Sequence, residues 1–218
     1  MKLWICLSMI GWIKMSNVLR IMDYLDHLIP NPKCELLYNK DYELLIAVML
    51  SAQTTDKRVN SVTKELFKKY DSLNKLRKAS LDDVLLFVRP LGSYTKKAKA
   101  VLMISNILYN EYNGVVPNDR EALERLPMVG RKTTNVVMAE LFNTSAIAVD
   151  THVLRVSKRL GLVSDNSNPL EVEKKLENVI PKDKWIRVHH QLVLFGRYYC
   201  KAKNPCCDKC KLKDICNK

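Results

Sequence analysis

The sequence predicts an all-α protein, and three features support this fold class. Hydrophobic residues make up 47% of the 218 residues, which is enough to bury a core. The chain contains only 6 glycines and 8 prolines, whereas all-β sandwiches and Gly-rich dinucleotide-binding folds need many more turn residues. Apolar residues recur at helical spacing, and no alternating strand pattern of useful length occurs. We therefore expect helices to dominate, in one large or two small domains.

The first helix is expected to begin at Asn17 and to end before Pro30, because the residue before a proline disfavours helical geometry. Residues 1–16 precede it and contain an apolar run of about ten residues, which is short for a membrane span. No small-residue cleavage site follows this run. We interpret residues 1–16 as an uncertain extension with Met15 or Met22 as the true start, and an anchor or export signal is the alternative.

The middle of the chain is expected to contain six helices. Residues 42–52 are apolar on nearly every face and follow Asp41 as the N-cap, which is typical of a buried central helix. Helices are also expected from Thr55, from Ser80 in a capping box with Asp83, over 95–112 with a stop at Gly114, from Asp119, and over 133–142. Residues 90–92, Pro-Leu-Gly, separate two of them.

Three further helices are expected in the last third of the chain, and each follows a residue suited to an N-cap. These residues are Asp150, Asn168 and Asp183. The first of the three helices should end at Gly161, which suits a left-handed C-terminal stop.

Four cysteines near the C-terminus form the pattern C-x6-C-x2-C-x5-C: Cys200, Cys207, Cys210 and Cys216. Four sulfur ligands fit either tetrahedral zinc or a [4Fe-4S] cluster, and the surrounding segment is too polar to bury four unrelated thiols. We interpret Cys206 as a bystander, because adjacent residues rarely both face one cluster. Five of the 7 cysteines lie between residues 200 and 216, which argues against a secreted disulfide framework and favours the cytoplasm.

The formal charge of +13 favours a polyanionic partner, with nucleic acid ahead of an acidic membrane surface. Residues 181–218 carry ten Lys and Arg against three Asp, so more than half of the excess charge surrounds the cysteines. We interpret Lys201 and Lys203 as phosphate contacts with salt-sensitive affinity. A merely solvated basic face is the alternative.

Residues 126–133, LPMVGRKT, predict a tight turn that leads into a helix. Backbone N–H groups from Gly130 onward would point toward an anion. Arg131 and Lys132 lie at the same positive helix end, which costs about 0.3–1 kcal/mol each without an anion. A bound phosphate explains Arg131. For Lys132 the same field also favours the neutral amine, a better nucleophile, and a phosphate-binding lysine is the alternative.

Four elements together resemble the endonuclease III family of helix-hairpin-helix, iron–sulfur DNA glycosylases. They are SAQTTD (51–56), LPMVGRKTTNVV (126–137), AVDTHVLRV (148–156) and the four-cysteine tail. The elements occur in the order and spacing of the family, and the similarity covers about residues 17 to 216.

The resemblance implies roles for individual residues. Lys132 matches the Schiff-base lysine, Asp150 the catalytic carboxylate, and Gln53 a residue that enters the gap left by a flipped base. The four cysteines match the ligands of a [4Fe-4S] cluster. Gly130, Arg131 and His152 are further candidates for contacts with DNA, although Asp150 is also a plain N-cap by local sequence, and His152 either contacts phosphate or packs in its helix.

The resemblance also implies two closely packed helical domains with DNA bound across the cleft between them. Residues 34–144 would form a six-helix domain with the helix-hairpin-helix motif, and residues 17–33 plus 145–218 would form the cluster domain.

Two residues depart from the family pattern. Met128 occupies a hairpin position that usually carries glycine, so the turn must avoid a positive φ there or accept strain. Ser93 occupies the position of an apolar wedge that fills the duplex, where a hydroxymethyl group is too small. Leu91 and Tyr94 are the candidates to replace it.

These features predict a bifunctional DNA glycosylase and abasic-site lyase that removes oxidised or damaged pyrimidines from duplex DNA, acting as a monomer without a membrane partner. A related adenine glycosylase would lack Lys132 and carry an added C-terminal domain. A non-catalytic cluster-bearing DNA-binding protein leaves the presence of both Lys132 and Asp150 unexplained. An electron-transfer protein fits the cluster but not the hairpin.

Overall fold

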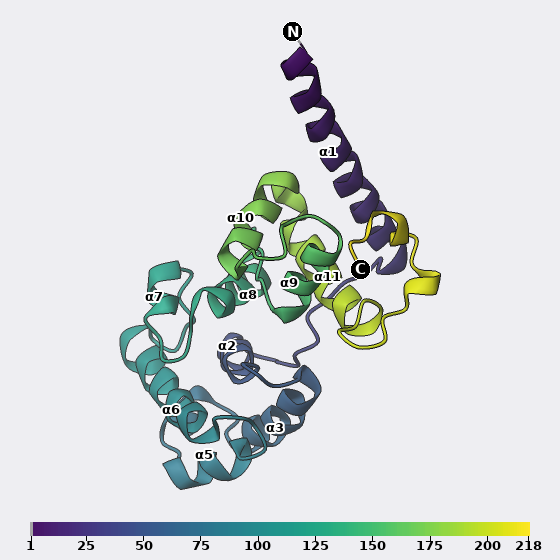
Figure 1. The fold of residues 1–218 in the computed structure, drawn as a ribbon. Helices are drawn as coiled ribbons and strands as arrows, with labels where there is room; N and C mark the ends of the chain where they lie inside the picture. The colour runs from purple at the N-terminus through teal and green to yellow at the C-terminus, as the bar shows by residue number, and fades with distance from the viewer. Residues whose placement is uncertain (1) are drawn as a thin grey trace. The chain divides into compact units, whose positions relative to one another are not determined.

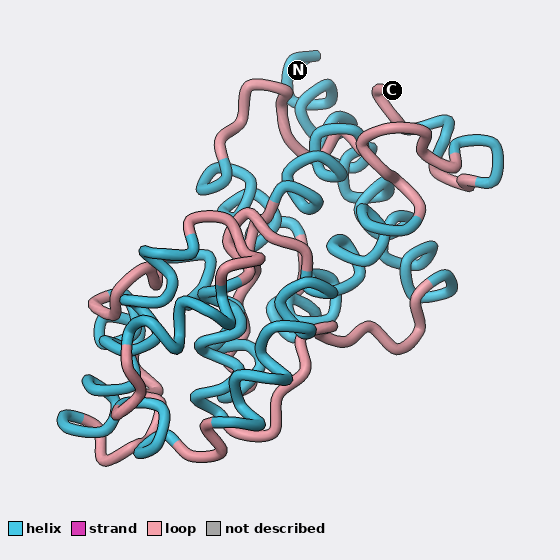
Figure 2. The backbone as a smooth tube through the Cα atoms, turned by 90° about the horizontal axis from the view of Figure 1, so that it is seen from below, coloured by secondary structure: helices cyan, strands magenta, loops and turns pink. Residues whose placement is uncertain are grey.

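The computed structural model describes residues 2–218, with side chains from residue 15 onward. Helices and loops account for all of this described part, and no strand occurs in it (Figure 2). The prediction of an all-α fold is therefore confirmed. The chain divides into two compact units, one of Cys34–Thr144 and the other of Met1–Lys33 with Ser145–Lys218. Within the described residues, none of the helices combines the length and apolar character needed to cross a membrane.

The unit of residues 34–144 is built around α2 (Asp41–Leu50) (Figure 1). Every residue of this helix after Asp41 is buried. The surrounding helices are α3 (Asp56–Lys69), α4 (Leu73–Arg77), α5 (Leu81–Val88), α6 (Tyr94–Glu111), α7 (Arg120–Glu124) and α8 (Arg131–Phe142). Helix α2 contacts α3, α6 and α8, so the expectation of a central buried helix is confirmed.

This unit, described throughout, contains seven helices rather than the expected six. The additional helix is α4, five residues long, whose N-cap Ser72 accepts a hydrogen bond from the backbone N–H of Lys75. Only Leu73 and Leu76 are buried in it, and two apolar positions are too few to produce a helical pattern in the sequence.

The expectation that Asp41 caps α2 is wrong. Asp41 is the first residue of the helix, and the N-cap is Lys40, whose side chain makes no capping bond. The carboxylate of Glu43 instead accepts a hydrogen bond from the backbone N–H of Asn39, at 2.8 Å. Both acidic side chains lie at the positive end of the helix dipole, which favours them there.

Other caps in this unit agree with the sequence. Ser80 accepts a bond from the N–H of Asp83, and Asp119 accepts one from the N–H of Ala122. The carboxylate of Asp83 does not complete a capping box, because it accepts hydrogen bonds from the Lys69 ammonium at 2.6 and 2.7 Å and from the Tyr70 hydroxyl. Gly114 has φ +80°, as expected for the residue after a helix stop.

The second unit contains α1 (Lys2–Leu28), α9 (Thr151–Arg159), α10 (Pro169–Val179) and α11 (Trp185–Tyr198). Helix α1 begins at Lys2 instead of Asn17, and residues 2–16 contain no proline that would interrupt it. Three short 3-10 helices complete it: Lys182–Lys184, Cys207–Lys209 and Lys213–Ile215. Asp183 lies inside the first of them and does not cap α11, so that expectation is wrong.

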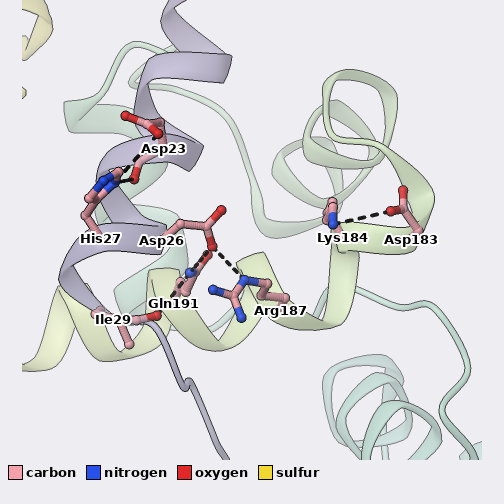
Figure 3. A network of polar contacts seen from close by, with 8 residues as sticks. All are labelled: Asp23, Asp26, His27, Ile29, Asp183, Lys184, Arg187 and Gln191. Carbon is pink, nitrogen blue, oxygen red and sulfur yellow. Dashed lines mark hydrogen bonds and ion pairs between the residues drawn. The ribbon is translucent and has the colours of Figure 1, made fainter.

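A polar network joins the end of α1 to α11 (Figure 3). Asp26 accepts hydrogen bonds from Arg187 at 2.6 Å and from the buried Gln191 at 2.9 Å, and Gln191 also donates to the carbonyl of Ile29 at 3.2 Å. Burial alone would raise the pKa of Asp26, but the bonds from Gln191 and Arg187 outweigh it and hold the pKa below its usual value. The network fixes α1 on the helix that leads into the cysteine segment.

Candidate active site

The turn between α7 and α8 presents Lys132 to solvent. Leu126 and Val129 of this turn are buried, and Gly130 precedes α8 without providing a side-chain cap. Arg131 and Lys132 are the first two residues of α8, which begins two residues earlier than expected, and both side chains are exposed. The first turn of α8 itself contains no acidic residue. A cationic side chain at a positive helix end is favourable only when an anion approaches.

The hairpin is held from behind by a buried amide. Asn135 is 1% exposed and accepts a hydrogen bond of 2.7 Å from Arg120, which joins α7 to α8. The lysine therefore projects from a rigid support.

Met128 accepts backbone strain. Its φ is +61°, in the left-handed region, and its side chain is 41% exposed. The hairpin therefore has the conformation that glycine would favour, with a methionine in it.

We expect Met128→Gly to raise the free energy of unfolding by about 0.5–1 kcal/mol, because the strain relieved exceeds the entropy that glycine adds to the unfolded chain. Met103→Gly is the matched control, since Met103 is 52% exposed in the middle of α6 and should lose about 1 kcal/mol there. Denaturant unfolding of both variants checks the signs; a loss of stability in Met128→Gly would show that the turn carries no relievable strain.

Two other turns of the same unit also contain residues with positive φ. Gln53, in the turn after α2, has φ +56° and is exposed, and Ser93, before α6, has φ +55° and is exposed. Gln53 and Gly92 line one cavity of about 630 Å³, together with residues of the first turns of α3. The structure thus brings together two of the turns that the sequence analysis assigned to DNA.

Leu91 and Tyr94, the two candidates to replace the apolar wedge, differ in burial. Leu91 is 1% exposed and is part of the core, so that candidate is wrong. Tyr94 is 43% exposed at the first position of α6. Tyr94 remains as a prediction for the large side chain beside Ser93.

Asp150 lies in the second unit, after the buried run of residues 146–149. Its Oδ1 accepts hydrogen bonds from the backbone N–H groups of His152 and Val153, both at 2.8 Å, so it is the N-cap of α9. Both bonds engage Oδ1, which leaves Oδ2 outside the cap. The capping interpretation is confirmed, and the cap orients a carboxylate whose second oxygen is available for chemistry.

His152 packs inside this unit. Its side chain is half-buried, and Nδ1 lies 3.2 Å from the Arg155 guanidinium. Burial lowers the pKa of His152, and Arg155 and Arg197 lower it further, although Asp150 opposes them. A Cβ at Gly196 of α11 would lie 2.8 Å from the His152 Cβ, so α9 and α11 meet here with room for glycine only. Contact of His152 with DNA stays a prediction.

All four patterned cysteines line one cavity of about 420 Å³, and Cys206 lines it too. The four are partly buried, whereas Cys206 is exposed. Apolar side chains form the inner wall, including Leu28, Leu160 and Phe195. Among the described residues, no three His, Cys, Asp or Glu side chains converge as ligands of a single metal ion. The thiols therefore surround a space and do not meet at a point.

Two arginines of α9 hold the chain around Cys200. Arg159 donates to the Cys200 Sγ at 3.3 Å and to the carbonyls of Lys201 at 2.7 Å and Ala202 at 3.2 Å. Arg155 donates to the carbonyls of Gly196 at 2.8 Å and Cys200 at 3.2 Å. Neither arginine was predicted from the sequence. The two are four residues apart on the helix that Asp150 caps, and this spacing is the signal that could have placed them on one helix face.

Helix α1 holds the far end of the segment. Arg20 forms a bidentate ion pair with Asp214, at 2.5 and 2.8 Å, and donates to the carbonyl of Lys211 at 2.8 Å. Lys201 and Lys203 are exposed on the backbone that Arg159 fixes. The cysteine segment is thus anchored at both ends by arginines, with lysines facing solvent.

Comparison with known proteins gives concordant matches. A family model described as HhH-GPD superfamily base excision DNA repair protein matches residues 46–182. Endonuclease III of Bacillus subtilis (strain 168) is 45% identical over 195 residues, 89% of each chain. Endonuclease III of Escherichia coli (strain K12) is 41% identical over 187 residues, 86% of this chain and 88% of the relative.

A solved structure of a trapped endonuclease III–DNA covalent intermediate is also similar. It has a TM-score of 0.90 and 45% sequence identity, and the match covers 93% of this chain and 95% of that one. A non-covalent endonuclease III–DNA complex matches equally well, with the same TM-score of 0.90.

The helical fold and the hairpin thus define a protein of the HhH-GPD superfamily of base excision DNA repair proteins. Within it, the chain belongs to the endonuclease III family.

Proposed function

We propose that this protein is a bifunctional DNA glycosylase and abasic-site lyase that removes oxidised or damaged pyrimidines from duplex DNA. The observation that carries the proposal is the exposed Lys132 at the uncapped, cationic start of α8, inside the segment that the family model matches. An amine in this position has the exposure that a nucleophile needs. The match to a trapped endonuclease III–DNA covalent intermediate supports a covalent step.

Lys132 and Asp150 divide the reaction between them. The neutral Lys132 amine attacks C1′ of the damaged nucleotide, and the base leaves with the electron pair of the glycosidic bond. Opening of the sugar gives an iminium on Lys132, loss of a C2′ proton expels the 3′-phosphate by β-elimination, and water then releases the lysine. The Asp150 carboxylate stabilises the cationic sugar and moves protons.

Duplex DNA is the proposed partner, with Gln53 and Ser93 at the distorted base pair and Gly130, Arg131, His152, Lys201 and Lys203 along the backbone. The exposed turns at Gln53 and Ser93 line or flank a common cavity, and Gly130 and Arg131 lie at a helix start that suits phosphate. We also propose a cytoplasmic, nucleoid-associated monomer, because reduced thiols are the ordinary state of cysteine in that compartment.

The cysteine site fits a [4Fe-4S] cluster better than zinc. One zinc ion requires four sulfurs at about 2.3 Å from a single point, and the partly buried thiols instead surround a cavity with an apolar wall. Cys200, Cys207, Cys210 and Cys216 would hold the cluster, and Cys206 is outside the set. A bound cluster would cross-link the segment and so keep the basic backbone around it in place.

Borohydride trapping on duplexes with different damaged bases tests the proposed function. A covalent complex should form with duplexes that contain an oxidised pyrimidine or an abasic site, and not with an undamaged duplex. If no damaged duplex yields a complex under conditions where the protein binds DNA, the chain is a non-catalytic DNA-binding protein. A complex only with a damaged purine would assign a different base specificity.

We expect the double variant Lys201→Ala/Lys203→Ala to bind damaged and undamaged duplexes more weakly and to a similar extent, because phosphate contacts carry no sequence information. The slope of log K against log salt should decrease by roughly 0.9 for each lysine–phosphate interaction that the substitutions remove. Lys218→Ala is a matched control from the same basic segment, outside the loop that Arg159 fixes. An unchanged salt slope in the double variant would make these lysines merely solvated.

A further inference from the structure

Lys97 of α6 is buried although it is a lysine. Of the lysines whose side chains the structure describes, it alone is buried, with 1% of its surface exposed. Burial of an ammonium is unfavourable unless hydrogen bonds replace the lost water, and here it lowers the pKa of Lys97. A buried lysine that the proposed chemistry does not use requires a different explanation.

The Lys97 ammonium binds both neighbours of Gln53. Its Nζ donates to the carbonyl of Ala52 at 2.8 Å and to the hydroxyl of Thr54 at 3.1 Å. The same hydroxyl lies 3.3 Å from the Ala52 carbonyl and can donate to it, which closes a small polar triangle behind the turn. Gln53 itself is exposed and strained, at φ +56°.

This triangle lies at the negative end of α2, which stops at Leu50. The carbonyl groups at a helix C-terminus favour a nearby cation. Within the turn, the Thr54 N–H donates to the Ser51 carbonyl at 3.0 Å. The two bonds from the Lys97 ammonium add to this local bond and stabilise a turn that contains the strained Gln53.

The backbone of Lys97 lies beside the second strained turn, which contains Ser93. The Lys97 N–H donates to the carbonyl of Ser93 at 3.1 Å, so Lys97 belongs to the first turn of α6, directly after the left-handed Ser93. Gly92 and Gln53 line the same cavity. One side chain therefore connects the two protruding turns that flank this cavity.

We propose that Lys97 is a positioning residue that fixes the Gln53 turn relative to the Ser93 turn, so that both turns meet a gapped base pair at a set spacing. This inference rests on the proposed function of Gln53. Lys97 touches neither DNA nor the reacting atoms. It acts through the backbone that carries Gln53, and its effect should appear only where the duplex has a gap to fill.

Lys97→Met tests the inference, because methionine fills a similar volume without the ammonium. The probe is a duplex that contains a stable tetrahydrofuran abasic analogue, compared with the same duplex intact. We expect the preference for the abasic duplex to fall about tenfold in Lys97→Met and by a similar factor in Gln53→Ala. In the double variant the two losses should not multiply, since both remove the same interaction.

Lys99→Met is the matched control, since Lys99 is exposed on the same helix and loses the same charge. It should keep the wild-type preference for the abasic duplex. Thr54→Val removes one partner of the ammonium and should give a smaller loss of preference, which keeps the inference testable if Lys97→Met folds poorly.

Two outcomes would overturn the inference while the proposed function stands. One is a wild-type preference in both Lys97→Met and Thr54→Val, with a lost preference in Gln53→Ala. The other is that Lys97→Met binds both duplexes more weakly by the same factor, and that this loss multiplies with the loss in Gln53→Ala. That result would show that Lys97 has a purely structural role. A wild-type protein without any preference for the abasic duplex would instead contradict the proposed function.

Discussion

Lys132→Gln is expected to abolish the borohydride-trapped complex and to lower base excision by at least about a thousandfold, because the covalent step loses its amine. Binding to undamaged duplex should change little, since most of that affinity comes from other phosphate contacts. Lys132→Arg is the sharper variant, because it keeps the positive charge at the start of α8 but cannot act as a neutral nucleophile. Trapping in either variant at the wild-type rate would show that another amine reacts.

The proposed catalytic role of Asp150 can be separated from its role as a helix cap. Asn at position 150 can still accept the two backbone hydrogen bonds, so Asp150→Asn should keep stability near the wild-type value and lose most base excision. Asp150→Ala should lose excision and also about 1 kcal/mol of stability, because the cap disappears. Normal excision by Asp150→Asn would reduce Asp150 to a helix cap.

Loss of the proposed cluster is expected to have the second large effect. Cys210→Ser should lower iron and sulfide content and expose the C-terminal segment to protease, whereas Cys206→Ser should retain both metal and protection. The physical reason is the small apolar content of residues 200–218, where Leu212 is the buried hydrophobic residue. The arginine hydrogen bonds from α1 and α9 cannot replace a cross-link between four thiols.

Metal analysis with visible absorbance, followed by limited proteolysis, measures both effects. Anaerobically prepared wild-type protein should be yellow-brown and contain iron and sulfide. Zinc without iron would overturn the cluster, and loss of metal in Cys206→Ser with retention in Cys207→Ser would exchange the assigned ligands.

Local features were predictable from the sequence because their causes are local. The caps at Ser80, Asp119 and Asn168 each accept a hydrogen bond from the backbone N–H three residues ahead, and Asn168 forms a full capping box with Glu171. The buried helix α2 was predictable because its residues are apolar on nearly every face. Where a helix begins at another residue than the one expected, as at Asp41 and Asp183, the local pattern misleads.

Long-range polar contacts could not be predicted in this way. The bond from Lys97 to Ala52 spans 45 residues, and the ion pair of Arg20 with Asp214 spans 194. Neither residue is distinguished from a surface cation by its neighbours in the sequence. The burial of Leu91 could not be predicted either. Leu91 lies between a proline and a glycine, outside any helical pattern that would indicate whether its side chain faces the core.

Peptide mapping of the trapped complex by mass spectrometry tests the assignment of Lys132 as the nucleophile most directly. The protein is trapped with borohydride on a duplex that contains an abasic site, digested, and searched for a lysine that carries the reduced sugar remnant. We expect a single modified position, Lys132. A modified lysine elsewhere, with Lys132 recovered unmodified, would contradict this assignment.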